Sequence, residues 1–318
     1  MAKILITGSK GVVGSWLIKI LSERGHAIFG VDLTHHAGSV GFEHEMSRSD
    51  FTYARCDVGN YRQLERIFEK AGPFDYVYHC AAEFGRWNGE DYYEQVWMTN
   101  AIGTKNVIRL QEKLGFKLIH FSSSEVYGDY PNVMTEDIMD KVEIKQMNDY
   151  ALSKWVNEQQ IRNSTIKHGT KTITVRLFNT YGPGEWYHPY RSVNCKFCYH
   201  ALHGIPVIVY KGHQRTSSYL EDTCRTLANI VENFKPGETY NIGGKELHSI
   251  ETLVKLVWKH SGASKHLINY ADNEVLTAKV KIVDNTKAER DLGHVCTVDI
   301  DEGVLRTIEW MRDYYHIS

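Results

Sequence analysis

A glycine-rich turn directly follows the first apolar run of the chain. The run at residues 4–6 leads into TGSKGVVG, residues 7–14, with glycines at positions 8, 11 and 14. Between a strand and a helix, such a turn lets the backbone approach a pyrophosphate, and the start of the helix offers free N–H groups to the anion. The spacing alone is weak evidence, because it arises by chance in many chains and also fits an ordinary strand–helix connection.

Strand and helix patterns alternate through the first half of the chain. Strands are expected at residues 3–7, 26–32, 51–57, 76–80, 117–122 and 172–177, and helices at 14–24, 61–70, 91–115 and 150–167. This alternation predicts an α/β fold with a Rossmann-type doubly wound parallel sheet. After Gly182-Pro183-Gly184 the rhythm changes, which predicts a smaller C-terminal region with a boundary near residue 180. Residues 206–230 are expected to return to the main sheet as a strand and a helix.

Composition excludes several classes of partner. The net charge of −2 and the absence of a polybasic run argue against nucleic acid and membrane surfaces. No apolar stretch approaches the ~20 residues of a spanning helix, and the N-terminus lacks the pattern of a signal peptide. Scattered cysteines are typical of a reduced, cytoplasmic protein. Cys195 and Cys198 are expected on one helix rather than in a metal site, because no second ligand pair follows.

An acidic residue ends the second expected strand. Asp32 falls where a carboxylate accepts hydrogen bonds from the ribose hydroxyls of a dinucleotide, which favours NAD over NADP. Asp57 ends the third strand and is a candidate for contact with adenine. Ala81 and Ala82 follow the fourth strand, where small side chains let the chain approach the cofactor. These last assignments are also compatible with simple tight turns.

Hydroxyl groups and a tyrosine–lysine pair follow the next strand. Tyr150 and Lys154 open a helix at spacing i, i+4 and therefore share one face. A lysine ammonium, together with the positive nicotinamide of NAD, is expected to lower the pKa of the tyrosine phenol from its ordinary value near 10. The phenolate can then take the proton of an alcohol, with Ser124 hydrogen-bonding the same hydroxyl. A surface helix with an incidental tyrosine and lysine is the alternative.

Several motifs occur together in the order of one family. They are Thr7-Gly8-x-x-Gly11-x-x-Gly14, Asp32, Asn100-x-x-Gly103-Thr104, Ser122 to Gly128, Tyr150-x-x-x-Lys154, Arg176-x-x-Asn179-x-Tyr181-Gly182-Pro183, Arg215, Asp222, Asn241-Ile242-Gly243 and Asp284-Asn285-Thr286-Lys287. The chain resembles an extended short-chain dehydrogenase/reductase of the nucleotide-sugar epimerase/dehydratase group over nearly its whole length. The resemblance implies an NAD-binding domain at 1–180 and a mainly nucleotide-sugar-binding region at 181–318.

The resemblance also implies a set of site residues. The catalytic residues it implies are Tyr150, Lys154, Ser124 and Glu125. The cofactor-binding residues are Gly8, Gly11, Val12, Val13, Gly14, Asp32, Asp57, Val58, Ala81, Ala82, Asn100, Ser122, Tyr150 and Lys154. The substrate-binding residues are Arg86, Ser123, Ser124, Asn179, Arg191 and Arg215, with Arg215 in a loop that is shorter than usual in the family.

Glu125 bears on which reaction follows. By resemblance, tightly bound NAD takes hydride from C4 of a nucleotide-diphosphate sugar, and Glu125 is the base for C5 in a dehydratase-type elimination of water. Many 4,6-dehydratases carry Asp-Glu here, whereas this chain has Ser124-Glu125. A UDP-hexuronate decarboxylase or 4-epimerase, with Arg86 or Arg191 on the carboxylate, and a net C4 dehydrogenase stay open. So does a non-catalytic NAD sensor, which the intact Tyr-Lys pair disfavours.

Relatives of this kind commonly form homodimers. The resemblance implies that two long helices, at about residues 91–114 and 148–168, pair with those of a second copy in a four-helix bundle.

Overall fold

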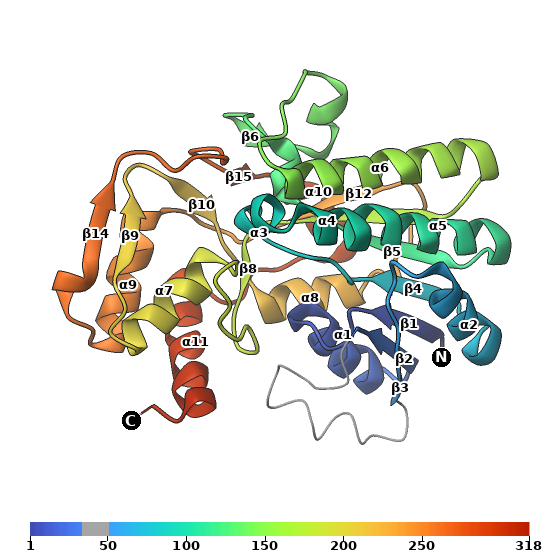
Figure 1. Ribbon diagram of the computed structural model, residues 1–318, viewed down its shortest axis with the longest axis horizontal. Helices are drawn as coiled ribbons and strands as arrows, with labels where there is room; N and C mark the ends of the chain where they lie inside the picture. Colours follow the sequence, from blue (N-terminus) through green and yellow to red (C-terminus); the bar gives the residue numbers. More distant parts are fainter. Residues whose placement is uncertain (34–50, 318) are drawn as a thin grey trace.

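The computed structural model describes residues 1–33 and 51–317. Its centre is a sheet of parallel strands in the order β12-β7-β5-β4-β1-β2-β3 (Figure 1). The strands are β1 Lys3–Thr7, β2 Ala27–Asp32, β3 Phe51–Arg55, β4 Tyr76–His79, β5 Lys117–Ser123, β7 Thr172–Leu177 and β12 Thr239–Ile242. The expected Rossmann-type doubly wound sheet is therefore confirmed.

Helices cover both faces of this sheet. On one face lie α1 Val12–Glu23 and α8 Leu220–Ala228, which share a hydrophobic core with strands β1, β4, β5, β7 and β12. On the other lie α2 Tyr61–Ala71, α5 Gly103–Leu114 and α6 Asp149–His168, which form a second core with the same sheet (Figure 1). Because both faces are buried, the central strands are almost continuously apolar, as parallel strands usually are.

The winding of the sheet reverses at β1. From β1 the chain moves outward to β2 and β3, then crosses back to β4 on the other side of β1. The register pairs Thr7 with both Val31 and His79, so the carboxyl ends of β1, β2 and β4 end level with one another. In sheets of this kind, ligands bind at the carboxyl ends of the strands where the winding reverses.

The long helix expected at residues 91–115 is instead a broken series. It comprises α3 Arg86–Asp91, α4 Tyr93–Val96, the π-helical turn η1 Trp97–Ile102 and α5. The break between α3 and α4 lies at Tyr92, whose φ of −139° is not helical. The π turn presents Asn100 inward, where its amide accepts a hydrogen bond from the backbone N–H of Glu83 at 2.8 Å and donates to the carbonyl of Glu83 at 3.0 Å. A single π turn of this kind often marks a functional site.

A second region packs beside the sheet with its own hydrophobic core. It contains α7 Val193–Leu202, β9 Val207–Tyr210, α9 Ile250–Ser261, β14 Ile268–Ala271 and α11 Ile300–Tyr315. Short pairs connect the two parts: β8 Thr180–Tyr181 with β11 Ser218–Tyr219, β10 Gln214–Thr216 with β13 Leu247–Ser249, and β6 Val133–Met134 with β15 Ile282–Val283. The remaining elements are η2 Ser124–Tyr127, η3 Glu136–Asp140, η4 Lys265–Leu267 and α10 Thr286–Leu292.

One sequence expectation about this region was half wrong. The strand expected from residue 206 is β9, which pairs with β14 in the small region and not with the main sheet. Its burial alternates between buried and more exposed positions, as in a sheet covered on one face, whereas β12 is almost fully buried and supplies the last strand of the main sheet. The helix of the same segment, α8, does return to the main sheet. The boundary near residue 180 stays a prediction.

No helix among residues 1–33 and 51–317 is long and apolar enough to cross a membrane.

Candidate active site

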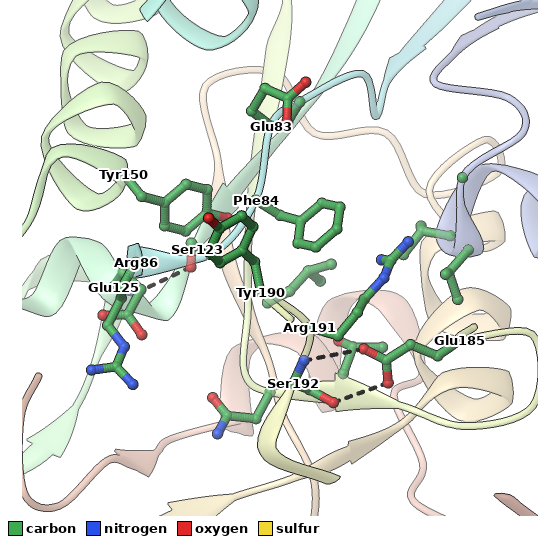
Figure 2. Close-up of a pocket in the computed structure, with 18 of the residues that line it drawn as sticks. Glu83, Phe84, Arg86, Ser123, Glu125, Tyr150, Glu185, Tyr190, Arg191 and Ser192 are labelled. Atoms are coloured by element: carbon green, nitrogen blue, oxygen red, sulfur yellow. Dashed lines mark hydrogen bonds between the residues drawn. The ribbon is translucent and has the colours of Figure 1, made fainter. Parts of the chain in front are cut away.

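A cavity of about 1060 Å³ opens at the carboxyl ends of β1, β2, β4 and β5. One end is lined by the glycine turn, and the other extends to α7 and the loop before it. Figure 2 shows Tyr150 and Ser123 on one side of the cavity, with Glu125 and Arg86 close by, and Arg191 and Glu185 on the opposite side. Side chains from both regions of the molecule thus line the same space.

The glycine turn fits a dinucleotide because side chains cannot be added to it. Gly8 has φ +68°, and a Cβ there would lie 2.6 Å from the backbone nitrogen of Ala81. A Cβ on Gly14 would lie 2.2 Å from the carbonyl oxygen of Gly8. The turn is therefore packed against β4 and against itself, with its backbone at the cavity and α1 starting behind it at Val12. This is the arrangement in which a pyrophosphate meets backbone N–H groups and a helix N-terminus.

Asp32 lies at the rim of the same cavity. Its two carboxylate oxygens accept hydrogen bonds from the backbone N–H groups of Lys10 at 2.9 Å and Leu33 at 2.7 Å. Lys10 lies within the glycine turn, so these bonds hold the carboxylate beside that turn. This is the position expected for a residue that binds the ribose of a dinucleotide. Of the other residues predicted to bind the cofactor, those that line the cavity are Gly8, Gly11, Val12, Val13, Gly14, Asp57, Val58, Ala81, Ala82, Ser122, Tyr150 and Lys154.

Asn100 differs from that prediction. It does not line the cavity: it is 1% exposed, and its amide holds the backbone of Glu83 and the hydroxyl of Ser153 at 3.0 Å. Asn100 therefore positions the cavity wall at residues 81–84. Ser122 does line the cavity, but its hydroxyl donates to Glu158 at 2.5 Å and belongs to a buried structural network.

Tyr150 and Lys154 lie in the first turns of α6. The helix begins where Asn148 caps it, accepting a hydrogen bond from the N–H of Ala151 at 2.8 Å. The ammonium of Lys154 lies 5.9 Å from the centre of the Tyr150 ring and donates to the carbonyl of Phe121 at 2.9 Å. Both side chains face the cavity, as the sequence spacing predicted.

The protonation of this pair follows from burial. Burial raises the pKa of Tyr150 to about 12, a hydrogen bond with Ser123 lowers it, and the charge of Glu125 raises it. Burial also lowers the pKa of Lys154 to about 8. The sequence analysis expected a lowered pKa for the Tyr150 phenol, caused by the Lys154 ammonium together with the positive charge of a bound nicotinamide. The side chains of the chain by themselves keep the phenol protonated at neutral pH.

The hydroxyl that hydrogen-bonds Tyr150 belongs to Ser123. The sequence analysis expected Ser124 to hydrogen-bond the same substrate hydroxyl as Tyr150, whereas the serine that contacts the phenol in the structure is Ser123. Ser123 ends β5, and Ser124 begins η2, where it is 2% exposed and still borders the cavity. The Ser123 side chain also accepts a hydrogen bond from the N–H of Glu125 at 3.2 Å (Figure 2). Ser123 therefore contacts both the phenol of Tyr150 and the backbone of Glu125.

Glu125 forms a buried ion pair that the sequence did not reveal. Its Oε1 contacts the ammonium of Lys281, which is 1% exposed. Burial would raise the pKa of Glu125, but Lys281, Arg86 and Arg215 together lower it below 4.5. Glu125 is therefore a carboxylate at neutral pH. The two residues are 156 positions apart, so no local sequence pattern could have linked them.

The predicted substrate residues all border the cavity. Arg86 is paired with Glu274 at 2.7 Å, and it also donates to the carbonyl of Val275. Arg215 donates to the carbonyls of Gln214 at 2.8 Å and Lys279 at 3.0 Å. Both arginines therefore hold the segment that leads to Lys281, in addition to facing the cavity.

Arg191 is held differently, between two aromatic rings. Its guanidinium lies 4.0 Å from the centre of the Phe84 ring and 4.6 Å from that of Trp186. Its Nε is buried without a hydrogen-bond partner among the described residues. Burial lowers the pKa of Arg191, and Glu185 nearby raises it. A stacked guanidinium with unused donors at a cavity wall can bind a planar or tetrahedral anion.

Cys195 and Cys198 are buried on α7, as expected, and no group of side chains within the described ranges could hold a metal ion.

Comparisons with known proteins agree with this geometry. The profile of the NAD dependent epimerase/dehydratase family matches residues 4–243. The dTDP-glucose 4,6-dehydratase of Salmonella typhimurium is 28% identical, over 97% of this chain and 92% of its own. The UDP-glucuronic acid decarboxylase 1 of Xenopus tropicalis is 29% identical, over 98% of this chain and 72% of its own.

Solved structures show the same fold. A crystal structure of the UDP-glucose 4-epimerase of Thermotoga maritima with UDP-glucose is 25% identical, with a TM-score of 0.87, and the match covers 98% of this chain and 99% of that one. The family resemblance predicted from the motifs is confirmed, and the cofactor of this family is NAD. The chain belongs to the NAD-dependent epimerase/dehydratase family.

Proposed function

We propose that this chain is a nucleotide-sugar lyase of the dehydratase type, which oxidises C4 of a nucleotide-diphosphate sugar and then eliminates water. The observation that carries the proposal is the position of Glu125. It is an ionised carboxylate that borders the same cavity as Tyr150, and its charge acts on the Tyr150 phenol. A base in the same cavity as the oxidising group supports removal of a proton from a carbon next to the oxidised one.

The first step uses Tyr150, Ser123 and Lys154. NAD held by the glycine turn and Asp32 would supply the acceptor for the C4 hydride and the hydride that is later returned. Tyr150 as phenolate takes the proton of the C4 hydroxyl, and Ser123 orients that hydroxyl by a hydrogen bond. A cation brought to the phenol lowers its pKa, so the phenolate and the oxidised cofactor stabilise each other. Lys154 keeps a positive charge beside both at neutral pH, since its pKa of about 8 leaves most of it protonated.

The second step uses Glu125. The C4 ketone acidifies the C5–H bond, and Glu125 takes that proton to leave an enolate. The leaving hydroxyl needs one proton, and the Asp-Glu pair of many dehydratases is Ser124-Glu125 here. Glu125, which now carries the proton taken from C5, gives it to the C6 hydroxyl; the C6–O bond breaks, water leaves and the enolate electrons form the C5–C6 double bond. One carboxylate thus serves first as base and then as acid.

The cations around Glu125 favour a second candidate, a UDP-hexuronate decarboxylase or 4-epimerase. Arg86, Arg215 and Lys281 all lower the pKa of Glu125, so the base lies in a positive environment. Such an environment attracts a hexuronate carboxylate. The 29% identity to a UDP-glucuronic acid decarboxylase is in line with this reading. A net C4 dehydrogenase and a non-catalytic NAD sensor need no base at Glu125.

Product mass separates these candidates. The NAD-loaded enzyme is incubated with dTDP-glucose, UDP-glucose and UDP-glucuronic acid, and the products are weighed by mass spectrometry. A dehydratase gives loss of water, a decarboxylase loss of carbon dioxide, an epimerase no change in mass with a new isomer, and a dehydrogenase loss of two hydrogens. A sensor converts none of them.

The matched variant is Glu125→Gln. It is expected to reduce bound NAD with the substrate as wild type does, and to stop before water is lost. Loss of water at the wild-type rate in Glu125→Gln would contradict the proposed role of this residue.

A further inference from the structure

Lys281 is fixed in place before β15 by its backbone. Its N–H donates to the carbonyl of Gln214 at 3.1 Å, and its own carbonyl accepts from the hydroxyl of Thr216 at 3.1 Å. Both partners belong to β10, next to Arg215. The lysine backbone is therefore held on both sides, and its side chain extends from there into the interior, where it is 1% exposed.

The ammonium meets one carboxylate. Among residues 1–33 and 51–317, the only acidic side chain in ion-pair contact with Lys281 is Glu125. Burial lowers the pKa of Lys281 to about 8, and Glu125 raises it. An ammonium with so little access to water is costly unless it is paired. The contact between Lys281 and Glu125 is therefore a buried ion pair and not a surface salt bridge.

The geometry of the contact leaves half of the carboxylate free. Lys281 contacts Oε1, and no described residue donates a hydrogen bond to Oε2. Glu125 borders the cavity, whereas Lys281 does not. Lys281 therefore contacts the Glu125 carboxylate from outside the cavity lining and holds its Oε1. Oε2 has no protein donor among the described residues and is available to a molecule in the cavity.

We infer that Lys281 is a positioning residue, which holds the Glu125 carboxylate ionised and aimed at the cavity for proton transfer. The inference rests on the proposed role of Glu125 as base. The other charged or titratable groups that act on Glu125 are Arg86 from α3, Arg215 from β10 and Tyr150 from α6. Removing Lys281 therefore weakens the positive environment of Glu125 without abolishing it.

The test measures protonation of Glu125 directly. Difference infrared spectra between each enzyme and its Glu125→Gln counterpart isolate the carboxyl band of this residue, which is followed against pH. The set is wild type, Lys281→Met, Lys281→Arg and Lys279→Met. Lys279→Met is the matched control, because it is the same substitution at an exposed lysine two positions earlier.

Wild type, Lys279→Met and Lys281→Arg are expected to keep Glu125 ionised to below pH 4.5. In Lys281→Met, the carboxyl is expected to protonate roughly one to three pH units higher, because an opposite charge at contact distance lowers a carboxyl pKa by about that much. Where Lys281→Met does not fold, Lys281→Gln replaces it, since it keeps a polar side chain without the charge.

A purely structural role predicts a different result. In that case Lys281→Met unfolds at a lower temperature while the carboxyl band titrates as in wild type, and the inference is overturned. The pH dependence of the turnover rate gives a second measurement. The pH below which turnover falls should be higher in Lys281→Met than in wild type, and it should be close to the wild-type value in Lys281→Arg. Full turnover by Glu125→Gln would defeat the proposed function, yet it would leave the infrared titration as it was, so the two failures are distinguishable.

Discussion

At the scale of single residues, two buried lysines near the cavity have different partners. Lys281 has a carboxylate partner, Glu125. Lys154 is 4% exposed, donates to the carbonyl of Phe121, and has no carboxylate in contact among the described residues. Burying a charge without a counter-ion costs stability. The buried ammonium of Lys154 is therefore expected to lower the stability of the folded state, a cost that proteins accept where a residue is needed for activity.

Replacing that ammonium should stabilise the protein. The folded-state pKa of Lys154, about 8, lies below its ordinary value of 10.5, so the charged form is disfavoured by folding at every pH below about 8. Lys154→Met is expected to raise the free energy of unfolding at pH 7 by about 1–3 kcal/mol and to abolish turnover. Urea unfolding of the cofactor-free protein measures it.

The effect of Lys154 on stability depends on pH. Between pH 8 and 10.5 the folded lysine loses its proton while the unfolded lysine keeps it, so wild-type stability rises through this window relative to Lys154→Met. A Lys154→Met protein that is less stable than wild type at pH 7 would contradict this account of the site.

A second prediction concerns Gly14 in the glycine turn. A Cβ on Gly14 would lie 2.2 Å from the carbonyl oxygen of Gly8, within the turn itself. Gly14→Ala is therefore expected to abolish NAD binding, measured by calorimetry. Gly169→Ala is the control: this glycine ends α6 at φ +65° with nothing near the added carbon, so it should cost about 1 kcal/mol of stability and leave NAD affinity intact. Equal NAD affinity in both variants would refute the assignment.

Local motifs predicted the residues of this site that lie close together in sequence. The glycines, Asp32, Tyr150 and Lys154 each carry a signal within a few positions, and the structure places them where the motifs require. Lys281 carries no such signal, because its partner is 156 positions away. The shift of the hydroxyl from Ser124 to Ser123 was also hidden, since it depends on where β5 ends and η2 begins.

At the scale of elements, a buried network fixes η2 against the sheet. Arg176 of β7 pairs with Glu158 of α6 at 2.6 and 3.0 Å and donates to the hydroxyl of Tyr127 at 2.8 Å. That hydroxyl donates to Asn241 of β12 at 2.7 Å. The network connects three elements around the turn that carries Glu125, so it determines where the carboxylate lies.

Breaking this network should be costly. Arg176→Met leaves the Glu158 carboxylate buried without its cation, and the expected loss is about 3–5 kcal/mol in the free energy of unfolding. The control is Arg162→Met, whose pair with Asp140 is exposed, with 62% and 67% of the side chains accessible. That pair should contribute less than about 1 kcal/mol. Equal losses in the two variants, measured by urea unfolding, would be inconsistent with a structural network.

Periodicity predicted most elements of the sheet and its helices, and it failed in two places for identifiable reasons. The helix expected at 91–115 is broken at Tyr92, whose φ of −139° is not helical, and it contains a π turn in which Asn100 binds the backbone of Glu83. The Asn100 contact is tertiary and does not alter the apolar pattern. β9 is a short apolar run and β12, Thr-Tyr-Asn-Ile, is not, so the sequence favoured β9 for the main sheet; the strands are assigned to their sheets by their long-range partners, β14 and β7.

At the scale of the whole molecule, the two regions meet across the cavity. The main sheet supplies the glycine turn, Tyr150 and Glu125, and the smaller region supplies Arg191 and Arg215. Lys281 also links distant parts of the chain, because it lies shortly before β15 and pairs with Glu125, which follows β5. The cavity that contains the phenol is therefore lined by both regions.

Apolar side chains on the outer helices suggest a second copy as partner. Near α4, η1 and α6, five large side chains are exposed by 39–52%: Tyr92, Tyr93, Met98, Ile102 and Leu152. We propose a homodimer through these helices. Ile102→Glu is expected to give a monomer in sedimentation experiments, whereas Ile208→Glu, an equally exposed position on β9, should leave the dimer intact. A wild-type protein that is monomeric at high concentration would rule the dimer out.

The most direct test of the central claim is the first hydride transfer in Tyr150→Phe. The variant is loaded with NAD and mixed with the nucleotide sugar that wild type converts, and formation of bound NADH is followed by absorbance in a single turnover. The account predicts NAD binding as in wild type and reduction slower by at least about a hundredfold, the usual loss when a positioned acid–base group is removed. Reduction at the wild-type rate would show that Tyr150 is not the base, and the assignment of this cavity as an oxidising site would have to be abandoned.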